Sequence, residues 1–223
     1  MDQKKRYALV GVGGRARFFY QALGSTYKET SDIVAFCDIN QGRMDYANSI
    51  LKNEYGVGPV PTYLAWEYEK MIRETKPDVI IVTTIDRTHH KYITKAMELG
   101  CDAITEKPMT TDEEKCQAIL DVVKKTGRHL RVTFNYRYAP HNTKIRELIR
   151  DEVIGDVNSV HFEWLLDTQH GADYFRRWHR DKRNSGGLLV HKSTHHFDLV
   201  NFWLGARPKT IFAMGDLMFY GRE

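Results

Sequence analysis

The 223-residue sequence predicts an α/β fold whose first half is a doubly wound parallel sheet, and two observations support this prediction. Short apolar runs of strand length alternate with longer segments of helical periodicity, and glycine or proline separates many of them. Strands that alternate with helices form a parallel sheet covered on both faces. Strands are therefore expected at residues 7–10, 33–37, 60–63, 78–84, 102–105 and 130–134, and helices at residues 17–23, 43–52, 68–75, 90–99 and 111–126.

Local signals set the limits of these elements. Because proline cannot donate to a sheet ladder, Pro59 and Pro61 place residues 60–63 at an edge of the sheet. Gly100 is a C-terminal signal for the fourth helix. Asp112 and the acids after it favour the start of the fifth helix, where the helix dipole stabilises negative charge.

The first strand runs into a glycine-rich turn that contains Gly11, Gly13, Gly14 and Arg15. A strand, a glycine turn and a helix in this order place backbone N–H groups at a helix N-terminus, which suits the pyrophosphate of a dinucleotide. Gly11 is expected to allow the tight turn and Gly13 the close approach of the pyrophosphate. Because glycine turns also end strands for structural reasons, this motif needs a second signal.

Asp38 supplies the second signal, at the end of the second strand and 22 residues beyond Ala16. An acid at about this spacing binds the adenosine ribose hydroxyls, although Asp38 is also a plausible turn residue. Its carboxylate repels a 2′-phosphate, so the predicted cofactor is NAD. Arg43 lies close enough in sequence to keep NADP possible.

The composition excludes several other classes of protein. A net charge of +4 is too mild to indicate nucleic acid, and no apolar stretch approaches the ~20 residues of a membrane span. Three cysteines without metal-type spacing fit a reducing compartment. The short apolar run near the N-terminus is a strand rather than a signal peptide. A cytoplasmic protein without nucleic-acid or membrane partners is therefore expected.

Two further segments leave the carboxyl ends of the expected strands, where ligands bind in such sheets. Residues 84–89 follow the fourth strand, and Glu106-Lys107-Pro108 follows the fifth. Proline fixes the backbone beside Lys107, so this lysine is carried on a stiff turn. The alternative is that Lys107 is an ordinary solvated lysine.

The second half has a different pattern. Residues 141–150 form an expected helix, residues 157–165 alternate like a half-buried strand of an open sheet, and residues 209–214 offer another strand. A helix is expected up to Leu204, and it places His191 and His195 on one face. Histidines four apart can also bind zinc, but the Glu of an H-E-x-x-H motif is missing, so no metal is predicted.

A basic, aromatic loop at residues 174–183 precedes that helix. It contains Trp178 among five cations, a pattern that suits a sugar-like or anionic ligand better than nucleic acid. Trp178 is therefore a predicted substrate-binding residue, because an aromatic ring can stack on the apolar face of a sugar.

Taken together, these motifs resemble the Gfo/Idh/MocA family of NAD(P)-dependent sugar and inositol dehydrogenases. The resemblance covers the glycine turn, Asp38, residues 84–89, Glu106-Lys107-Pro108, residues 135–137 and residues 186–198. It implies a Rossmann-type NAD(P)-binding domain at residues 1–134. It also implies an incomplete α+β domain at residues 135–223 with an open, mostly antiparallel sheet. Since family members are longer, the resemblance implies a truncated chain and, at full length, a homo-oligomer formed through the second sheet.

The resemblance also implies roles for individual residues. Lys107 holds the reacting oxygen, and His195 is the general base. His191 stands where the family has an aspartate, so its catalytic role departs from the pattern, and Lys192 is an alternative occupant of that role. The implied cofactor-binding residues are Gly11, Gly13, Gly14, Arg15, Asp38, Thr84, His89 and Glu106, and the substrate-binding residues, with Trp178, are Asn135, Arg137 and Lys192.

The expected activity is hydride transfer between NAD(P) and a secondary hydroxyl of a sugar, sugar derivative or cyclitol. Two alternatives stay open. The same site can perform NAD-assisted glycoside cleavage, or the protein can bind NAD or a sugar without catalysis. A metal hydrolase that uses His191 and His195 is a third hypothesis.

Overall fold

The computed structural model describes residues 3–216, which divide between Thr133 and Phe134 into two compact units. The first unit contains a sheet of six parallel strands in the order β3-β2-β1-β4-β5-β6. This is the strand order of a Rossmann fold. The strands are β1 (Lys5–Val10), β2 (Ser31–Asp38), β3 (Thr62–Leu64), β4 (Val79–Val82), β5 (Asp102–Glu106) and β6 (Leu130–Thr133).

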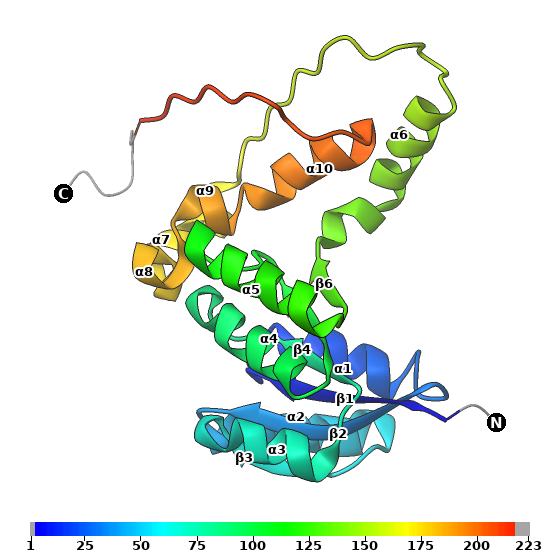
Figure 1. Cartoon of the computed structure of the whole chain (residues 1–223), viewed down its shortest axis with the longest axis vertical. Coiled ribbons are helices and arrows are strands. Elements are labelled where there is room, and N and C mark those ends of the chain that lie inside the picture. Colours follow the sequence, from blue (N-terminus) through cyan, green and yellow to red (C-terminus); the bar gives the residue numbers. More distant parts are fainter. Residues whose placement is uncertain (1–2, 217–223) are drawn as a thin grey trace. The chain divides into compact units, whose positions relative to one another are not determined.

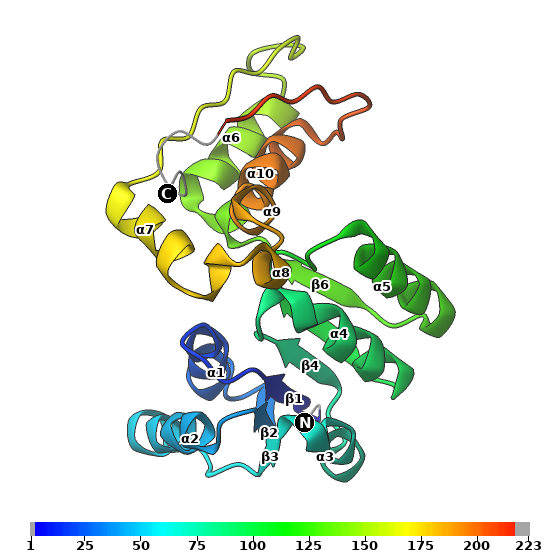
Figure 2. The same cartoon turned by 90° about the vertical axis from the view of Figure 1, so that its left-hand side faces the viewer.

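Helices cover both faces of this sheet, as the alternation of strands and helices predicts (Figures 1 and 2). On one face, α1 (Ala16–Gly24) and α2 (Gln41–Tyr55) pack apolar side chains around Leu9, Phe36 and Ile81. On the other face, α3 (Tyr68–Thr75), α4 (His89–Glu98) and α5 (Glu113–Thr126) pack around Ala8, Ile80 and Ala103. Central strands buried on both sides explain their uninterrupted apolar sequence.

The edges of the sheet also follow from the sequence. β3 is an edge strand, as the flanking prolines predict, and Phe36 N donates to Pro61 O at the start of that pairing. The pairing of β1 with β2 shifts register between Tyr7 and Ala8, whereas the pairing of β1 with β4 keeps one register throughout. Because all these strands are parallel, the carboxyl ends of β1, β2, β4 and β5 lie at one edge of the sheet.

The second unit is helical in the part that the structure describes. A short turn, η3 (Asn135–Tyr138), leads into α6 (Pro140–Arg150), which begins with proline at its first position. The remaining elements are α7 (Thr168–Arg176), η4 (Trp178–Arg180), α8 (Lys182–Ser185), α9 (Leu188–His191) and α10 (Thr194–Leu204). Residues 174–183, expected as a loop, thus lie largely in short helices.

The strands expected in the second unit are not seen among residues 134–216. Residues 157–165 and 209–214 lie in irregular segments without helix or strand (Figure 1). A strand is stable only when its backbone N–H and C=O groups bond to a neighbouring strand. Alternating apolar residues therefore fail to specify a strand here, and the expected antiparallel sheet is not confirmed.

The prediction of one helix through His191 and His195 is wrong, because the helix is interrupted between α9 and α10. Ser193 N donates to Leu188 O, and His195 N donates to Lys192 O, so the regular bonding four residues back is interrupted. Ser193 and Thr194 are weak in helix interiors because their hydroxyls compete for backbone groups. The two histidines therefore do not share one helical face.

Candidate functional site

The glycine turn is fixed first by its contact with the end of β4. Gly11 has a φ of +84°, and a Cβ on it would lie 2.6 Å from Thr84 N and 2.7 Å from Thr83 C. Thr83 Oγ1 donates to Gly11 O at 2.6 Å. Gly11 is thus required by the fold itself, since both its backbone conformation and its packing exclude a side chain.

Gly13 and Gly14 differ from Gly11 in having no such structural reason. Neither has a positive φ, and a Cβ on either would meet no described atom within 4 Å. The two residues lead into α1, whose N-cap residue Arg15 makes no side-chain capping bond. The turn therefore leaves open space in front of a helix N-terminus, the arrangement that receives a pyrophosphate.

Asp38 ends β2 beside this turn and is 4% exposed. Its Oδ2 accepts from Val12 N at 2.6 Å, and its Oδ1 accepts from Asn40 N at 2.9 Å. Arg43 Nη1 lies 3.6 Å from Oδ1. The carboxylate thus positions the glycine turn directly. Since each carboxylate oxygen can accept more than one hydrogen bond, ribose hydroxyls can still bind to it.

Arg15 and Glu106 connect the glycine turn to the end of β5. Arg15 Nε donates to Glu106 Oε1 at 2.7 Å, and Thr133 Oγ1 donates to the same oxygen at 3.0 Å. The Glu106 side chain is 7% exposed, whereas that of Arg15 is 43% exposed. This ion pair engages Nε of Arg15 and leaves the rest of the guanidinium partly accessible beside the glycine turn.

His89 ties the turn after β4 to the turn after β5. It is fully buried, with Nδ1 2.9 Å from Pro108 O and Nε2 3.0 Å from Thr84 O. These two contacts brace the segment that carries Lys107, which is half-buried and whose N–H donates to Glu106 Oε2 at 3.3 Å. With no exposed surface, His89 acts here on the two turns, and its contact with a cofactor stays a prediction.

The second unit brings Tyr136, Lys192 and His195 together. Lys192 Nζ donates to Tyr136 Oη at 2.8 Å, and the Tyr136 ring stacks on His195 with centroids 4.0 Å apart and planes 9° apart. Lys192 is 6% exposed and His195 5% exposed. The break between α9 and α10 produces this arrangement, because it turns Lys192 out of a regular helix.

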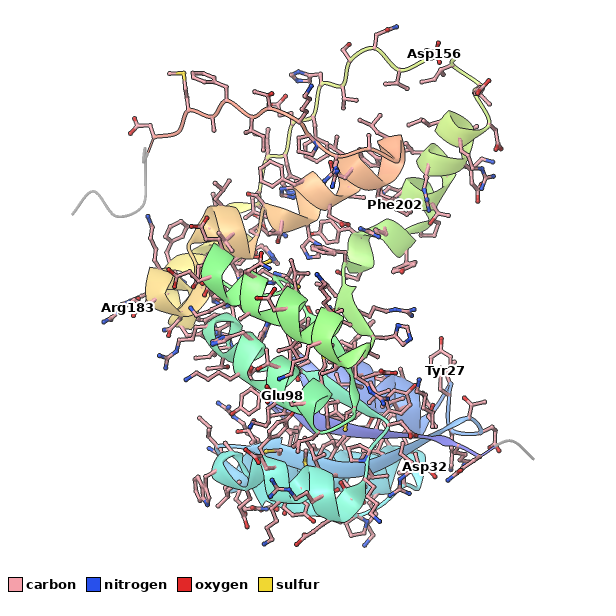
Figure 3. All side chains as sticks on the ribbon, in the orientation of Figure 1. Tyr27, Asp32, Glu98, Asp156, Arg183 and Phe202 are labelled. Atoms are coloured by element: carbon pink, nitrogen blue, oxygen red, sulfur yellow. The ribbon has the colours of Figure 1, made fainter. Side chains whose placement is uncertain are left out.

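Arg137 has a structural partner within its own unit. Its Nε donates to Asp198 Oδ2 at 2.7 Å and its Nη2 bonds the other carboxylate oxygen, so the pair is bidentate. The guanidinium also lies over the ring of Phe202, which is labelled on α10 in Figure 3. Asn135, by contrast, is exposed. Substrate roles for both residues stay predictions.

His191 has different neighbours from His195. Its ring lies against His179, Tyr174 and Trp178, with centroids 4.7, 5.5 and 5.5 Å away. The cations of this region point outward; Arg183, labelled in Figure 3, has an 88% exposed side chain and pairs with Asp181. Within residues 3–216, no group of three or more His, Cys, Asp or Glu residues is placed to hold a metal ion.

Several residues that complete these groups are not predicted site residues. Thr133 and Asp198 hold Glu106 and Arg137, and Tyr136 contacts both Lys192 and His195. Tyr136 lies between the predicted residues Asn135 and Arg137, but no spacing in the sequence connects it to a lysine 56 residues away.

Among the helices described in residues 3–216, none has the length and hydropathy of a membrane span.

Two models of one oxidoreductase family match this chain. Residues 5–134 match the oxidoreductase family model with an NAD-binding Rossmann fold, and residues 146–217 match its C-terminal alpha/beta domain. YteT of Bacillus subtilis (strain 168), named as an oxidoreductase, is 41% identical over 98% of this chain and 51% of its own length. Inositol 2-dehydrogenase of Rhizobium meliloti (strain 1021) is 32% identical over 63% of this chain and 41% of its own length.

Among solved structures, myo-inositol 2-dehydrogenase from Lactobacillus plantarum superimposes with a TM-score of 0.74. It is 23% identical, and the match covers 91% of this chain and 57% of that one, so it supports the fold alone. The chain spans about half the length of the curated relatives it matches. Because the family model with the NAD-binding fold covers more than half of the sequence, this chain belongs to the Gfo/Idh/MocA oxidoreductase family, and its first unit is an NAD-binding Rossmann domain.

Proposed function

We propose that this protein is an NAD-dependent dehydrogenase that oxidises a secondary hydroxyl of a sugar, sugar derivative or cyclitol. The observation that carries the proposal is the open space at Gly13 and Gly14 beside a helix N-terminus. Neither glycine is required by the fold, so a ligand that approaches the backbone closely explains them best. The carbohydrate-like substrate is suggested by the inositol dehydrogenase relative.

In this proposal, different residues of the chain bind the cofactor and act on the substrate. The first turn of α1 and the partly exposed Arg15 bind the pyrophosphate, and Asp38 binds the adenosine ribose. NAD, when bound, supplies the hydride acceptor. Lys107 stabilises negative charge on the reacting oxygen, and His195 takes the hydroxyl proton.

Asp38 also favours NAD over NADP. A buried carboxylate at the ribose repels a 2′-phosphate, although Arg43 beside it offers partial compensation. We therefore expect NADP to bind, but more weakly than NAD. A homo-oligomer of the full-length protein, formed through the second-domain sheet, is a separate proposal.

The test combines cofactor binding with turnover. Calorimetric titration measures the binding of NAD to the first unit. Absorbance of NADH at 340 nm reports oxidation of myo-inositol, other cyclitols and a panel of sugars. The Lys107→Met variant is expected to bind NAD normally and to lose at least about 100-fold in kcat, because a charge-stabilising donor contributes roughly that much. Lys124→Met, at an exposed lysine in the last turn of α5, is the matched control.

The outcomes separate the alternatives. Full activity of Lys107→Met refutes the role of this lysine, and the absence of NAD binding refutes the whole proposal. Cleavage of a glycoside without net NADH release identifies the NAD-assisted reaction instead. Binding of NAD without turnover of any substrate indicates a non-catalytic protein.

A further inference from the structure

Lys192 is a buried cation that lacks a carboxylate partner within residues 3–216. It is 6% exposed, and its ammonium makes one hydrogen bond, to the hydroxyl of Tyr136 at 2.8 Å. An ammonium has three N–H donors, so two stay available in this part of the chain. Buried ammonium groups are normally neutralised by an anion, because removal of the charge from water is costly.

The groups that neighbour Lys192 in residues 134–216 do not supply that anion. Asp198 is engaged in its bidentate pair with Arg137, so these two charges cancel each other. The pKa of His196 is lowered, first by burial and then by the charge of Lys192, which favours the neutral imidazole, and an imidazole supplies no negative charge in either form. His195 lies beside the pair as a ring stacked on Tyr136 and carries no negative charge. Among the described residues of this cluster, Lys192 is therefore a charge without a carboxylate partner.

Tyr136 adds a second donor next to the ammonium. Its oxygen accepts from Lys192, so its own O–H proton is free to point toward a ligand. Tyr136 is only partly buried, which leaves the pair a side from which a ligand can approach. Two donors from a lysine and a tyrosine match the two oxygens of a carboxylate.

From this geometry we propose that Lys192 and Tyr136 bind a carboxylate of the substrate, and that the substrate is a sugar acid such as a uronate. This inference rests on the proposed function, whose substrate class it narrows. One ammonium balances the single charge of a carboxylate. A phosphate, with a charge near −2, would leave negative charge unbalanced.

The test is a comparison of matched sugars by calorimetry, without cofactor and with NADH present. D-Glucuronate is compared with D-glucose, and D-galacturonate with D-galactose. At least one uronate is expected to bind ten or more times more tightly than its neutral partner, and the preference should weaken at high salt. In Lys192→Met the preference should disappear, and in Tyr136→Phe, which keeps the ring, it should fall several-fold.

Lys144→Met is the matched control, because this exposed lysine on α6 pairs with Glu147 at the surface. It should retain the full preference. Equal binding of uronate and neutral sugar, a preference that survives in Lys192→Met, or no binding of either uronate overturns the inference. D-Glucose 6-phosphate bound more tightly than D-glucuronate overturns the assignment to a carboxylate. Because sugar binding is measured apart from NAD binding and turnover, each proposal can fail separately.

Discussion

The two units of this chain hold their polar groups in different ways. In the first unit, the end of each central strand is fixed by neighbouring strands, and the glycine turn, Asp38 and Glu106 are positioned by backbone or strand-borne partners. In the second unit, no strand pairs within residues 134–216, and side-chain pairs such as Arg137–Asp198 connect its elements. Geometry fixed by the backbone tolerates side-chain changes better than geometry fixed by pairs of side chains.

The apolar residues show the same contrast. Strand residues such as Leu9 and Ile80 are completely buried between two helical layers. In the second unit, Leu165 is 87% exposed and Phe212 88% exposed. Exposed apolar side chains contribute little to stability, since the hydrophobic contribution scales with the area removed from water. The first unit is therefore expected to be the more stable one.

The largest effect is expected from Gly11→Ala. A Cβ at this position meets backbone atoms at 2.6–2.7 Å, and its φ of +84° disfavours any side chain. Overpacking and backbone strain together should lower the free energy of unfolding by about 3 kcal/mol or more. NAD binding should be lost as well. Denaturant unfolding and calorimetry measure the two effects.

Gly13→Ala is the matched variant, because its Cβ enters open space. It should change stability by less than about 1 kcal/mol and still weaken NAD binding at least tenfold, since the added methyl occupies the proposed pyrophosphate site. Normal NAD affinity in Gly13→Ala would place the cofactor elsewhere. Normal stability in Gly11→Ala would show that backbone fixation of the turn is weaker than the contacts indicate.

The next prediction tests the difference between the units directly. Cys37 and Cys101 are buried in the first unit, while three of the four tryptophans, Trp164, Trp178 and Trp203, lie in the second. Tryptophan fluorescence should therefore change at lower urea than thiol exposure, by about 1 M or more for a stability difference of a few kcal/mol. Coincident transitions would show that both units unfold as one and would break the comparison.

The sequence predicted the first unit well because its signals are local. Every strand from β1 to β6 overlaps its predicted range, since a short apolar run between breakers finds a neighbour on at least one side. The same signal at residues 157–165 was misleading, because alternation describes a face but does not supply a pairing partner. Strand formation depends on a second segment, and no property of one segment contains that information.

The placement of some candidate residues was predictable for a similar reason. Gly11 and Lys107 follow β1 and β5, and Asp38 ends β2, so the parallel topology places all three at one edge of the sheet. Contacts such as Arg15–Glu106, 91 residues apart, and Lys192–Tyr136, 56 apart, leave no trace in local spacing. The break at Ser193 also decided which residues Lys192 and His195 contact, and weak helix propensity alone did not predict it.

A smaller effect is expected from Glu106→Gln in the first unit. The change removes the charge of a nearly buried carboxylate that accepts from Arg15 and Thr133. Because Arg15 is partly exposed, the loss should be about 1–2 kcal/mol in urea unfolding. Glu54→Gln is the control, since its pair with Arg17 is exposed on both sides and should contribute much less. Equal losses in both variants would contradict a special position for Glu106.

The smallest effect concerns the pH dependence of the second unit. Burial, followed by the charge of Lys192, lowers the pKa of His196 below its ordinary value, and its Nε2 has no hydrogen-bond partner within residues 3–216. The unfolded chain therefore binds this proton more readily, so stability should be fully present above the ordinary histidine pKa and fall as the pH drops below it. Solvent screening limits the change to less than about 0.5 kcal/mol.

His196→Gln should remove this part of the acid sensitivity between pH 7 and pH 5. His161→Gln is the control, because that imidazole is 90% exposed in the same unit. Unfolding followed by tryptophan fluorescence gives the free energy of unfolding of each variant at both pH values. Both variants contain the same carboxylates, so the titration of these groups cancels when the two pH dependences are compared. An unchanged pH slope in His196→Gln would mean that the charge of Lys192 is already neutralised, and it would count against an uncompensated cation in this cluster.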